Sequence, residues 1–187
     1  MLNGLQQATL SEIARLLPLE VKQDVVVLYS EVARDARALV GISEFALYIA
    51  NSGYKLTHGE VKAFLRGMDL DGDGFLSVDE FCAALLDWSE LQTTYNDVFD
   101  ACRAKVFARL DRDGDGRLAL TDLAQLAPFG QDTRVGAGPP RSFRLNLDRS
   151  FQSADRHGRG WIDADEFAQT LRVPANAYRH FAKRLVP

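Results

Sequence analysis

Several features that mark other protein classes are scarce or absent in this chain of 187 residues. Only two cysteines occur, Cys82 and Cys102, and because two thiols make no disulfide framework we expect both to be small buried hydrophobic residues in a reducing compartment. No apolar run reaches about 18 residues, so we expect no membrane span. The stretch from Met1 to Arg15 lacks the basic patch and apolar block of a secretory signal. The net charge of −4 gives no reason to expect a nucleic-acid partner.

Motifs for catalysis are also missing. No glycine-rich loop that would cradle a phosphate and no nucleophile motif is present. The three histidines, His58, His157 and His180, are scattered along the chain. The hydrophobic content of 47% is nevertheless that of an ordinary globular protein, which excludes wholesale disorder. We therefore expect a folded protein that is not an enzyme.

The acidic residues, by contrast, are concentrated in two short segments. One runs from Asp69 to Glu80 and the other from Asp111 to Asp122. Each has carboxylates at positions 1, 3, 5 and 12, a glycine at position 6 and an aliphatic residue at position 8. This spacing is that of the EF-hand calcium loop.

The spacing has a physical reason. A hard cation such as Ca²⁺ takes about six to eight oxygen ligands, and acids at alternate positions of a curled loop can point inward together. Glycine allows the sharp turn, and position 7 offers its backbone carbonyl, so its side chain is unconstrained. The predicted metal ligands are Asp69, Asp71, Asp73, Phe75, Ser77 and Glu80 in one segment and Asp111, Asp113, Asp115, Arg117 and Asp122 in the other.

The two predicted sites differ at positions 9 and 12. Ser77 can hold a bridging water and Glu80 is long enough to bind with both oxygens, so we expect Ca²⁺ there, in the sensor range of roughly 10⁻⁷–10⁻⁵ M. The other site has Ala119 at position 9 and Asp122 at position 12. Because aspartate is shorter and usually binds with one oxygen, we expect this site to take Mg²⁺ or to bind Ca²⁺ more weakly.

Two further segments keep only part of the pattern. Asp155–Glu166 has His157 at position 3 and Arg159 at position 5, and since a guanidinium repels a cation we expect this loop to keep its fold and lose its metal. The alternative is that His157 ligates a softer metal. Ala33–Glu44 retains only Asp35 among the early ligands, so we expect it to serve in pairing alone. In chain order the four segments are the first (33–44), second (69–80), third (111–122) and fourth (155–166) loops.

Apolar residues at helical spacing flank these loops, as in the run Val61, Phe64, Leu65 and Met68. The predicted fold class is all-α: a two-lobed protein with four helix–loop–helix units, two of them degenerate, and short paired loop strands. We expect an N-terminal lobe over 1–92, with a degenerate unit at about 19–50 and a metal-binding unit at about 57–90. We expect a C-terminal lobe over 93–187, with a metal-binding unit at about 94–127, a degenerate unit at about 141–172 and a terminal helix at about 174–185.

A further helix is predicted before the first unit. Thr9 with Glu12 three residues later has the spacing of a capping box and predicts a helix start near Leu10. Such a helix either covers a lobe or binds a partner, and we favour the first role.

The four units together resemble the calmodulin and EF-hand superfamily over roughly residues 19–172. The stretch DLDGDGFLSVDEFCAALLDWSELQ, from Asp69 to Gln92, is similar to the calmodulin-like tails of plant and protist calcium-dependent protein kinases, above all in its EFCAAL run. This resemblance implies a calcium-responsive module that releases or braces a kinase domain. The chain departs from that pattern because it has no kinase segment and because two of its four loops are degenerate.

Three functions fit these features. The first is a calcium sensor or regulatory subunit that opens an apolar groove for a protein partner. The second is a constitutive interaction subunit of a larger assembly, with little calcium switching, and the third is a cation buffer. The chain has only two methionines, whereas promiscuous grooves are methionine-rich, so we expect one dedicated partner. Two degenerate loops argue against a buffer, and we favour the sensor, in the cytoplasm or in a cytoskeletal or ciliary assembly.

The mild net charge is a sum of unlike parts. Residues 1–133 hold 12 basic and 21 acidic residues, a net of −9, whereas residues 134–187 hold 10 basic and 5 acidic residues, a net of +5. The positive part is either a solvated face or a contact for an acidic partner surface, such as that of tubulin. The expected protein partner is therefore either a target helix or an acidic surface.

Overall fold

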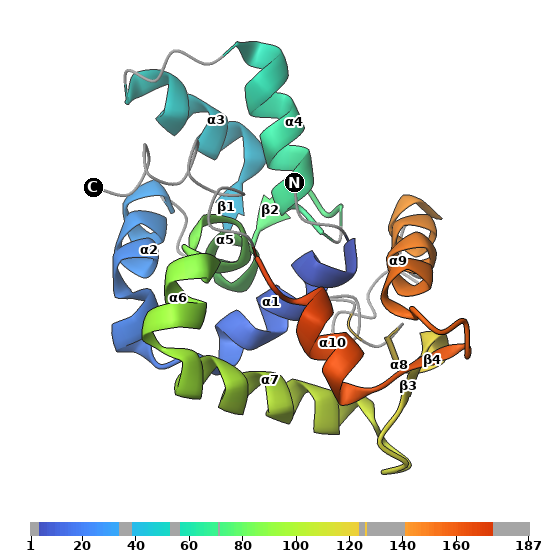
Figure 1. Ribbon diagram of the computed structural model, residues 1–187. Helices are drawn as coiled ribbons and strands as arrows, with labels where there is room; N and C mark the ends of the chain where they lie inside the picture. Colours follow the sequence, from blue (N-terminus) through green and yellow to red (C-terminus); the bar gives the residue numbers. More distant parts are fainter. Residues whose placement is uncertain are drawn as a thin grey trace.

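The structure is a computed structural model that describes residues 4–33, 39–52, 57–70, 72–123, 126 and 141–173. Helices dominate it, and within these ranges the strands form two short antiparallel pairs (Figure 1), so the predicted all-α fold class is confirmed. The elements are α1 (Gly4–Leu16), α2 (Leu19–Val32), β1 (Val40–Gly41), α3 (Ile42–Asn51), α4 (His58–Met68), β2 (Phe75–Leu76), α5 (Val78–Leu85), α6 (Trp88–Thr94), α7 (Asn96–Leu110), β3 (Leu118–Ala119), α8 (Leu120–Leu123), α9 (Arg141–Ala154), β4 (Trp161–Ile162) and α10 (Ala164–Thr170).

The aliphatic residue at position 8 joins the loops in pairs. Val40 of the first loop lies opposite Leu76 of the second, and Leu118 of the third lies opposite Ile162 of the fourth. All four side chains are fully buried. Each strand pair therefore places an apolar contact under two adjacent loops, which confirms the predicted pairing of loop strands.

Local signals explain where the loops turn and where the helices after them begin. The glycine at position 6 has a positive φ in the three loops where glycine is present, +84° at Gly74, +77° at Gly116 and +80° at Gly160, a region that other residues rarely adopt. Ser77 accepts a hydrogen bond from the Glu80 amide while the Glu80 carboxylate accepts one from the Ser77 amide, which caps α5. Asp163 caps α10 in the same way.

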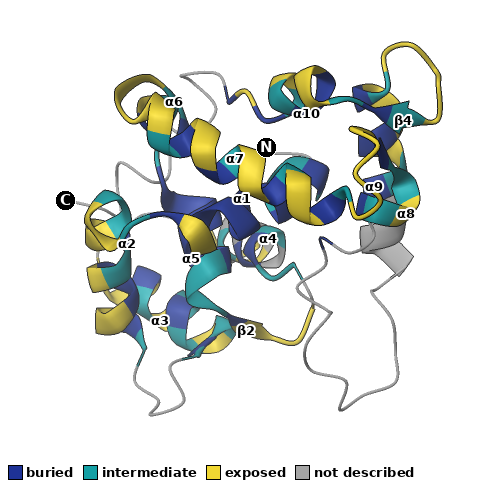
Figure 2. Cartoon of the chain, turned by 90° about the horizontal axis from the view of Figure 1, so that it is seen from below, coloured by how far each residue is buried: buried dark blue, intermediate teal, exposed yellow. Residues whose placement is uncertain are grey.

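Helix α1 lies between the two pairs of helix–loop–helix units. It packs against α5 of the first pair and against α7 and α9 of the second (Figure 1). Figure 2 shows it as buried, with α7 and α5 beside it. A helix that is buried on most of its faces is a core element. Its buried residues are Leu5, Ala8, Thr9, Leu10, Ser11, Glu12, Ile13 and Ala14.

The predicted start of this helix near Leu10 is wrong, because α1 begins at Gly4 and Thr9 lies inside it. The residues before Leu10 become helical because Leu5 and Ala8 are buried in the core, and this burial outweighs the local capping signal.

A short separate helix links the two pairs. The Asp87 carboxylate accepts a hydrogen bond from the Glu90 amide and so starts α6. The indole of Trp88 donates to the Ala83 carbonyl at 2.8 Å, and the Gln92 side chain donates to the Leu171 carbonyl at 2.7 Å, so α6 is tied both to α5 and to the chain after α10. The lobe boundary at 92/93 lies within α6 and stays a prediction.

Three other expectations concern composition and termini. Cys82 and Cys102 are both free and buried, as predicted. Within the described part of the chain, no helix has both the length and the apolar character needed to cross a membrane. The predicted terminal helix at about 174–185 lies outside the described residues.

Candidate metal centre

The third loop brings its first three acids together. Carboxylate oxygens of Asp111, Asp113 and Asp115 all lie within 4.8 Å of one another. Backbone amides hold them in place: Gly116 donates to Asp111 at 2.9 Å, and the amide of the residue after it donates to Asp115, also at 2.9 Å. Three hard oxygen donors on a solvent-accessible loop suit a divalent cation such as Ca²⁺ or Mg²⁺.

The other predicted ligands of the third loop lie around this cluster. The Asp122 carboxylate accepts a hydrogen bond from the Ala119 amide at 2.8 Å, so it faces back toward the loop from the start of α8. The Arg117 guanidinium lies over the Trp161 ring, with Cζ 4.4 Å from the ring centroid. This side chain therefore packs against the neighbouring loop, and the role of the Arg117 carbonyl as a metal ligand stays a prediction.

The second loop repeats the hydrogen bonds from the amides at positions 6 and 7. The Asp69 carboxylate accepts from the amides of Gly72 at 2.7 Å and Gly74 at 3.2 Å. Asp73 accepts from the Phe75 amide at 2.7 Å, and the Phe75 side chain is largely exposed. Asp71 lies outside the described residues. The loop thus has the backbone arrangement of the third loop at the positions that the structure describes.

Glu80, at position 12 of the second loop, is a buried carboxylate. One of its oxygens accepts from the Leu70 amide at 2.9 Å, and the other accepts from the amide and hydroxyl of Ser77 at 2.9 and 2.8 Å. Burial raises the pKa of Glu80, although these hydrogen bonds act in the opposite direction. Among the described residues no basic side chain pairs with it, so a metal ion would supply the charge that its surroundings lack.

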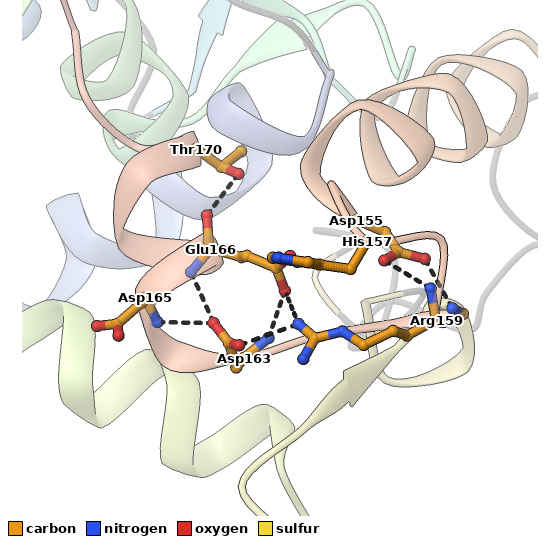
Figure 3. Close-up of polar contacts among 8 residues, drawn as sticks. Asp155, His157, Arg159, Asp163, Asp165, Glu166 and Thr170 are labelled. Carbon is orange, nitrogen blue, oxygen red and sulfur yellow. Dashed lines mark hydrogen bonds and ion pairs between the residues drawn. The ribbon is translucent and has the colours of Figure 1, made fainter.

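The fourth loop has the same outline and a different chemistry (Figure 3). Arg159 Nη2 lies 2.5 Å from one oxygen of Glu166, and His157 Nδ1 lies 2.8 Å from the other. Burial raises the pKa of Glu166, but hydrogen bonds from His157, the Asp163 amide and Arg159 outweigh it, so that the pKa falls below its ordinary value. The position-12 carboxylate already has a cationic partner; that this loop binds no metal stays a prediction.

The structure describes the first loop at Ala33 and at residues 39–44. Residues 34–38, which include Asp35, lie outside the described residues. At position 12 the Glu44 carboxylate accepts a hydrogen bond from the Gly41 amide at 3.0 Å, which caps α3.

The sequence does not predict a set of charges on α1 that contacts both pairs of helix–loop–helix units. Glu12 forms an ion pair with Arg109, just before the third loop, with Nη2 2.7 Å from a carboxylate oxygen. Arg15 Nε donates to Asp79 at 3.2 Å, in the second loop beside Glu80. These partners are distant in sequence, and no local pattern signals such contacts.

Comparisons with known proteins agree with this geometry. A family model described as an EF-hand domain pair matches residues 44–87. The chain is 30% identical over 129 residues to polcalcin Cup a 4 of Hesperocyparis arizonica, covering 69% of this chain and 67% of that protein. It is 36% identical over 90 residues to the probable calcium-binding protein CML14 of Oryza sativa subsp. japonica, covering 47% of this chain and 50% of that protein.

A longer relative matches nearly the whole chain. Calcium-dependent protein kinase 13 of Arabidopsis thaliana is 26% identical over 186 residues, covering 97% of this chain and 32% of the kinase. The chain therefore spans about a third of the length of the kinases that it matches.

Proposed function

The chain belongs to the EF-hand superfamily of calmodulin-like calcium-binding proteins, and we propose that it is a calcium-responsive regulatory subunit in which α1 occupies the apolar surface meant for a protein partner. The observation that carries this proposal is the burial of α1 between α5, α7 and α9. An apolar surface between helices is where proteins of this kind receive an amphipathic target helix. In this chain its own first helix fills such a surface.

Calcium binding in the loops can affect α1 because the helices that contact α1 begin or end at those loops. Helix α5 begins at Val78, inside the second loop, and α7 ends at Leu110, one residue before the third loop. Arg15 pairs with Asp79 in one loop, and Glu12 pairs with Arg109 beside the other. A cation that draws in the loop carboxylates would shift the helices that hold α1, and so change the free energy that keeps it docked.

We propose Ca²⁺ as the ion of the second loop and Ca²⁺ or Mg²⁺ as the ion of the third, held by the ligands predicted from the sequence. The described acids of both loops support this assignment, because the amides at positions 6 and 7 donate to the acids at positions 1 and 5 in both loops. We further propose that the chain itself is not an enzyme and that it acts in the cytoplasm. The buried free thiols support a reducing compartment.

The proposal is tested by apolar-dye fluorescence with and without calcium. We expect the dye signal to rise on calcium addition, because α1 leaves apolar surface behind when it undocks. The double variant Asp69→Ala and Asp111→Ala should abolish the rise, whereas the matched control Asp24→Ala, an exposed residue of α2, should not. An unchanged signal at saturating calcium in the wild-type chain would instead support the constitutive interaction subunit.

A further inference from the structure

The fourth loop holds a basic side chain at the place where its neighbours gather acids. Arg159 and His157 occupy positions 5 and 3, which are aspartates in the third loop and predicted ligands in the second. Arg159 Nη2 lies 2.5 Å from Glu166 Oε2 and 3.0 Å from Asp163 Oδ2. His157 Nδ1 lies 2.8 Å from Glu166 Oε1 (Figure 3). Both oxygens of the position-12 carboxylate are thus held by side chains from positions that would otherwise contribute metal ligands.

The rest of the fourth loop keeps the arrangement of its metal-binding neighbour. The Asp155 carboxylate accepts from the amides of Arg159 at 2.9 Å and Gly160 at 2.7 Å. In the third loop, Asp111 accepts from the equivalent amides of Asp115 and Gly116, at 3.1 and 2.9 Å. The fourth loop has therefore lost the acids at positions 3 and 5 without losing its curl, and it has kept a buried glutamate that requires a positive partner.

We propose that Arg159 is a built-in cation: its guanidinium takes the place of the metal ion in the fourth loop and holds Glu166, and with it the start of α10, in position whether or not calcium is present. This goes beyond the proposed function, which assigns no role to the fourth loop. A guanidinium suits the task because it is always charged and carries several N–H donors, and here its Nη2 contacts both Glu166 and Asp163.

The built-in cation also reaches the third loop. The Arg159 guanidinium lies over the Trp161 ring, with Cζ 3.7 Å from the ring centroid, and the Arg117 guanidinium lies over the same ring at 4.4 Å. Trp161 pairs with Ala119 across β3 and β4. Through this stack Arg159 orders the strand of the third loop in the metal-free chain. The third loop should therefore bind its ion without needing an ion in the fourth loop.

The first experiment measures thermal unfolding of the full chain in EDTA, where no metal contributes. Arg159→Met keeps the length of the side chain but removes the charge, and we expect it to lower Tm by about 4 °C or more. The matched control is Arg156→Met in the same loop, which is exposed and should leave Tm unchanged. Equal Tm values for the two variants would overturn the proposal. The result does not depend on any partner or on calcium, so it stands or fails separately from the proposed function.

A second experiment restores the acids and counts ions by native mass spectrometry with calcium as the probe. His157→Asp combined with Arg159→Asp recreates the full ligand pattern, and we expect this variant to bind one more Ca²⁺ per chain than the wild type. Calcium should also raise its Tm more than it raises that of the wild type. The proposal is overturned if the double variant gains no ion, or if the wild type already carries an ion that Asp155→Asn removes, which would favour His157 as a metal ligand.

Discussion

Glu80 and Glu166 hold the same position in two loops of one chain, and they differ in the charge of the groups around them. Both carboxylates are buried, and both accept a hydrogen bond from a backbone amide three residues earlier, at the start of the following helix. Around Glu80 the described donors are neutral amides and a hydroxyl, and burial raises its pKa. Around Glu166 stand a guanidinium and an imidazole, and its pKa is lowered despite the burial.

The difference shows two ways to satisfy one buried carboxylate. A buried charge is costly unless a partner of opposite charge accompanies it. The second loop has none among its described residues, and in the proposed function its partner is an ion from solution. The fourth loop carries its partner, Arg159, in its own sequence. On this proposal Glu80 responds to calcium concentration, whereas Glu166 does not.

The largest expected effect is on calcium binding at the second loop. Glu80→Gln removes one charged ligand oxygen, and since a hydrogen bond or contact to a charged group is worth about 1.5–3 kcal/mol, we expect a roughly 10- to 100-fold loss of affinity. Isothermal titration calorimetry with calcium measures it. Glu31→Gln, an exposed change on α2, is the control and should bind as the wild type does. Full retention of affinity in Glu80→Gln would mean that Glu80 is not a ligand.

The two glutamates are compared most directly by making each single variant and measuring its Tm both in EDTA and in calcium. In EDTA, Glu166→Gln should lower Tm more than Glu80→Gln, because it removes the buried one of the two carboxylates that Arg159 contacts. In calcium the order should reverse, because Glu80→Gln then forfeits ligand stabilisation of about 2.7 kcal/mol at a hundredfold excess over Kd. If the order is the same in both solutions, the two glutamates do not play different roles.

A smaller effect is expected from lengthening the acid of the third loop. Asp122→Glu should allow binding through both oxygens and raise the preference for Ca²⁺ over Mg²⁺ by about tenfold. Calcium titration in the presence of excess magnesium reports the change. An unaltered preference would place the selectivity of this site elsewhere than at position 12.

The ion pair between α1 and the end of α7 should contribute modestly to the free energy of unfolding. Glu12→Gln removes the ion pair with Arg109, whose side chain is 47% exposed, and the longer one with Arg15, so we expect a loss of about 1 kcal/mol in the free energy of unfolding. Urea denaturation provides the value. If α1 is coupled to calcium through this pair, the dye fluorescence of the variant without calcium should be higher than that of the wild type. Equal fluorescence of the two proteins without calcium would count against that coupling.

The smallest effect concerns Cys82 on α5. Burial raises its pKa to about 12, from an ordinary value of 9.0, so the folded chain keeps the thiol protonated. Stability from this group is complete below pH 9.0 and declines as pH rises toward 12, because only the unfolded chain ionises in that window. At pH 8 we expect Cys82 to react with a thiol reagent only as fast as the chain unfolds; fast labelling under native conditions would contradict its burial.

Local patterns in the sequence are sufficient to predict the structure of the loops. The acids, the glycine and the aliphatic residue of each loop lie within twelve residues of one another, so their spacing is enough to predict the tight turn of the loop. The same spacing predicts that Leu76 pairs with the first loop and Leu118 with the fourth. Local patterns do not predict which positive group pairs with the carboxylate at position 12. The sequence predicts only that Arg159 repels a metal ion, whereas in the folded chain Arg159 pairs with the retained Glu166.

Long-range packing accounts for what the sequence could not predict. Thr9 and Glu12 have the spacing of a capping box, but both are buried inside α1. Their surroundings come from α5, α7 and α9, which are remote in sequence, and periodicity identifies an apolar face without naming the helix that covers it. The ion pair of Glu12 with Arg109 is hidden for the same reason.

The most direct test of the central contrast is the number and location of bound calcium ions. Native mass spectrometry of the wild-type chain should show two Ca²⁺ at saturation, with Asp69→Asn and Asp111→Asn each removing one ion and Asp155→Asn removing none. The contrast between a loop that takes its cation from solution and a loop that carries its own would be contradicted by a third ion that disappears in Asp155→Asn, or by a second loop that stays empty at saturating calcium.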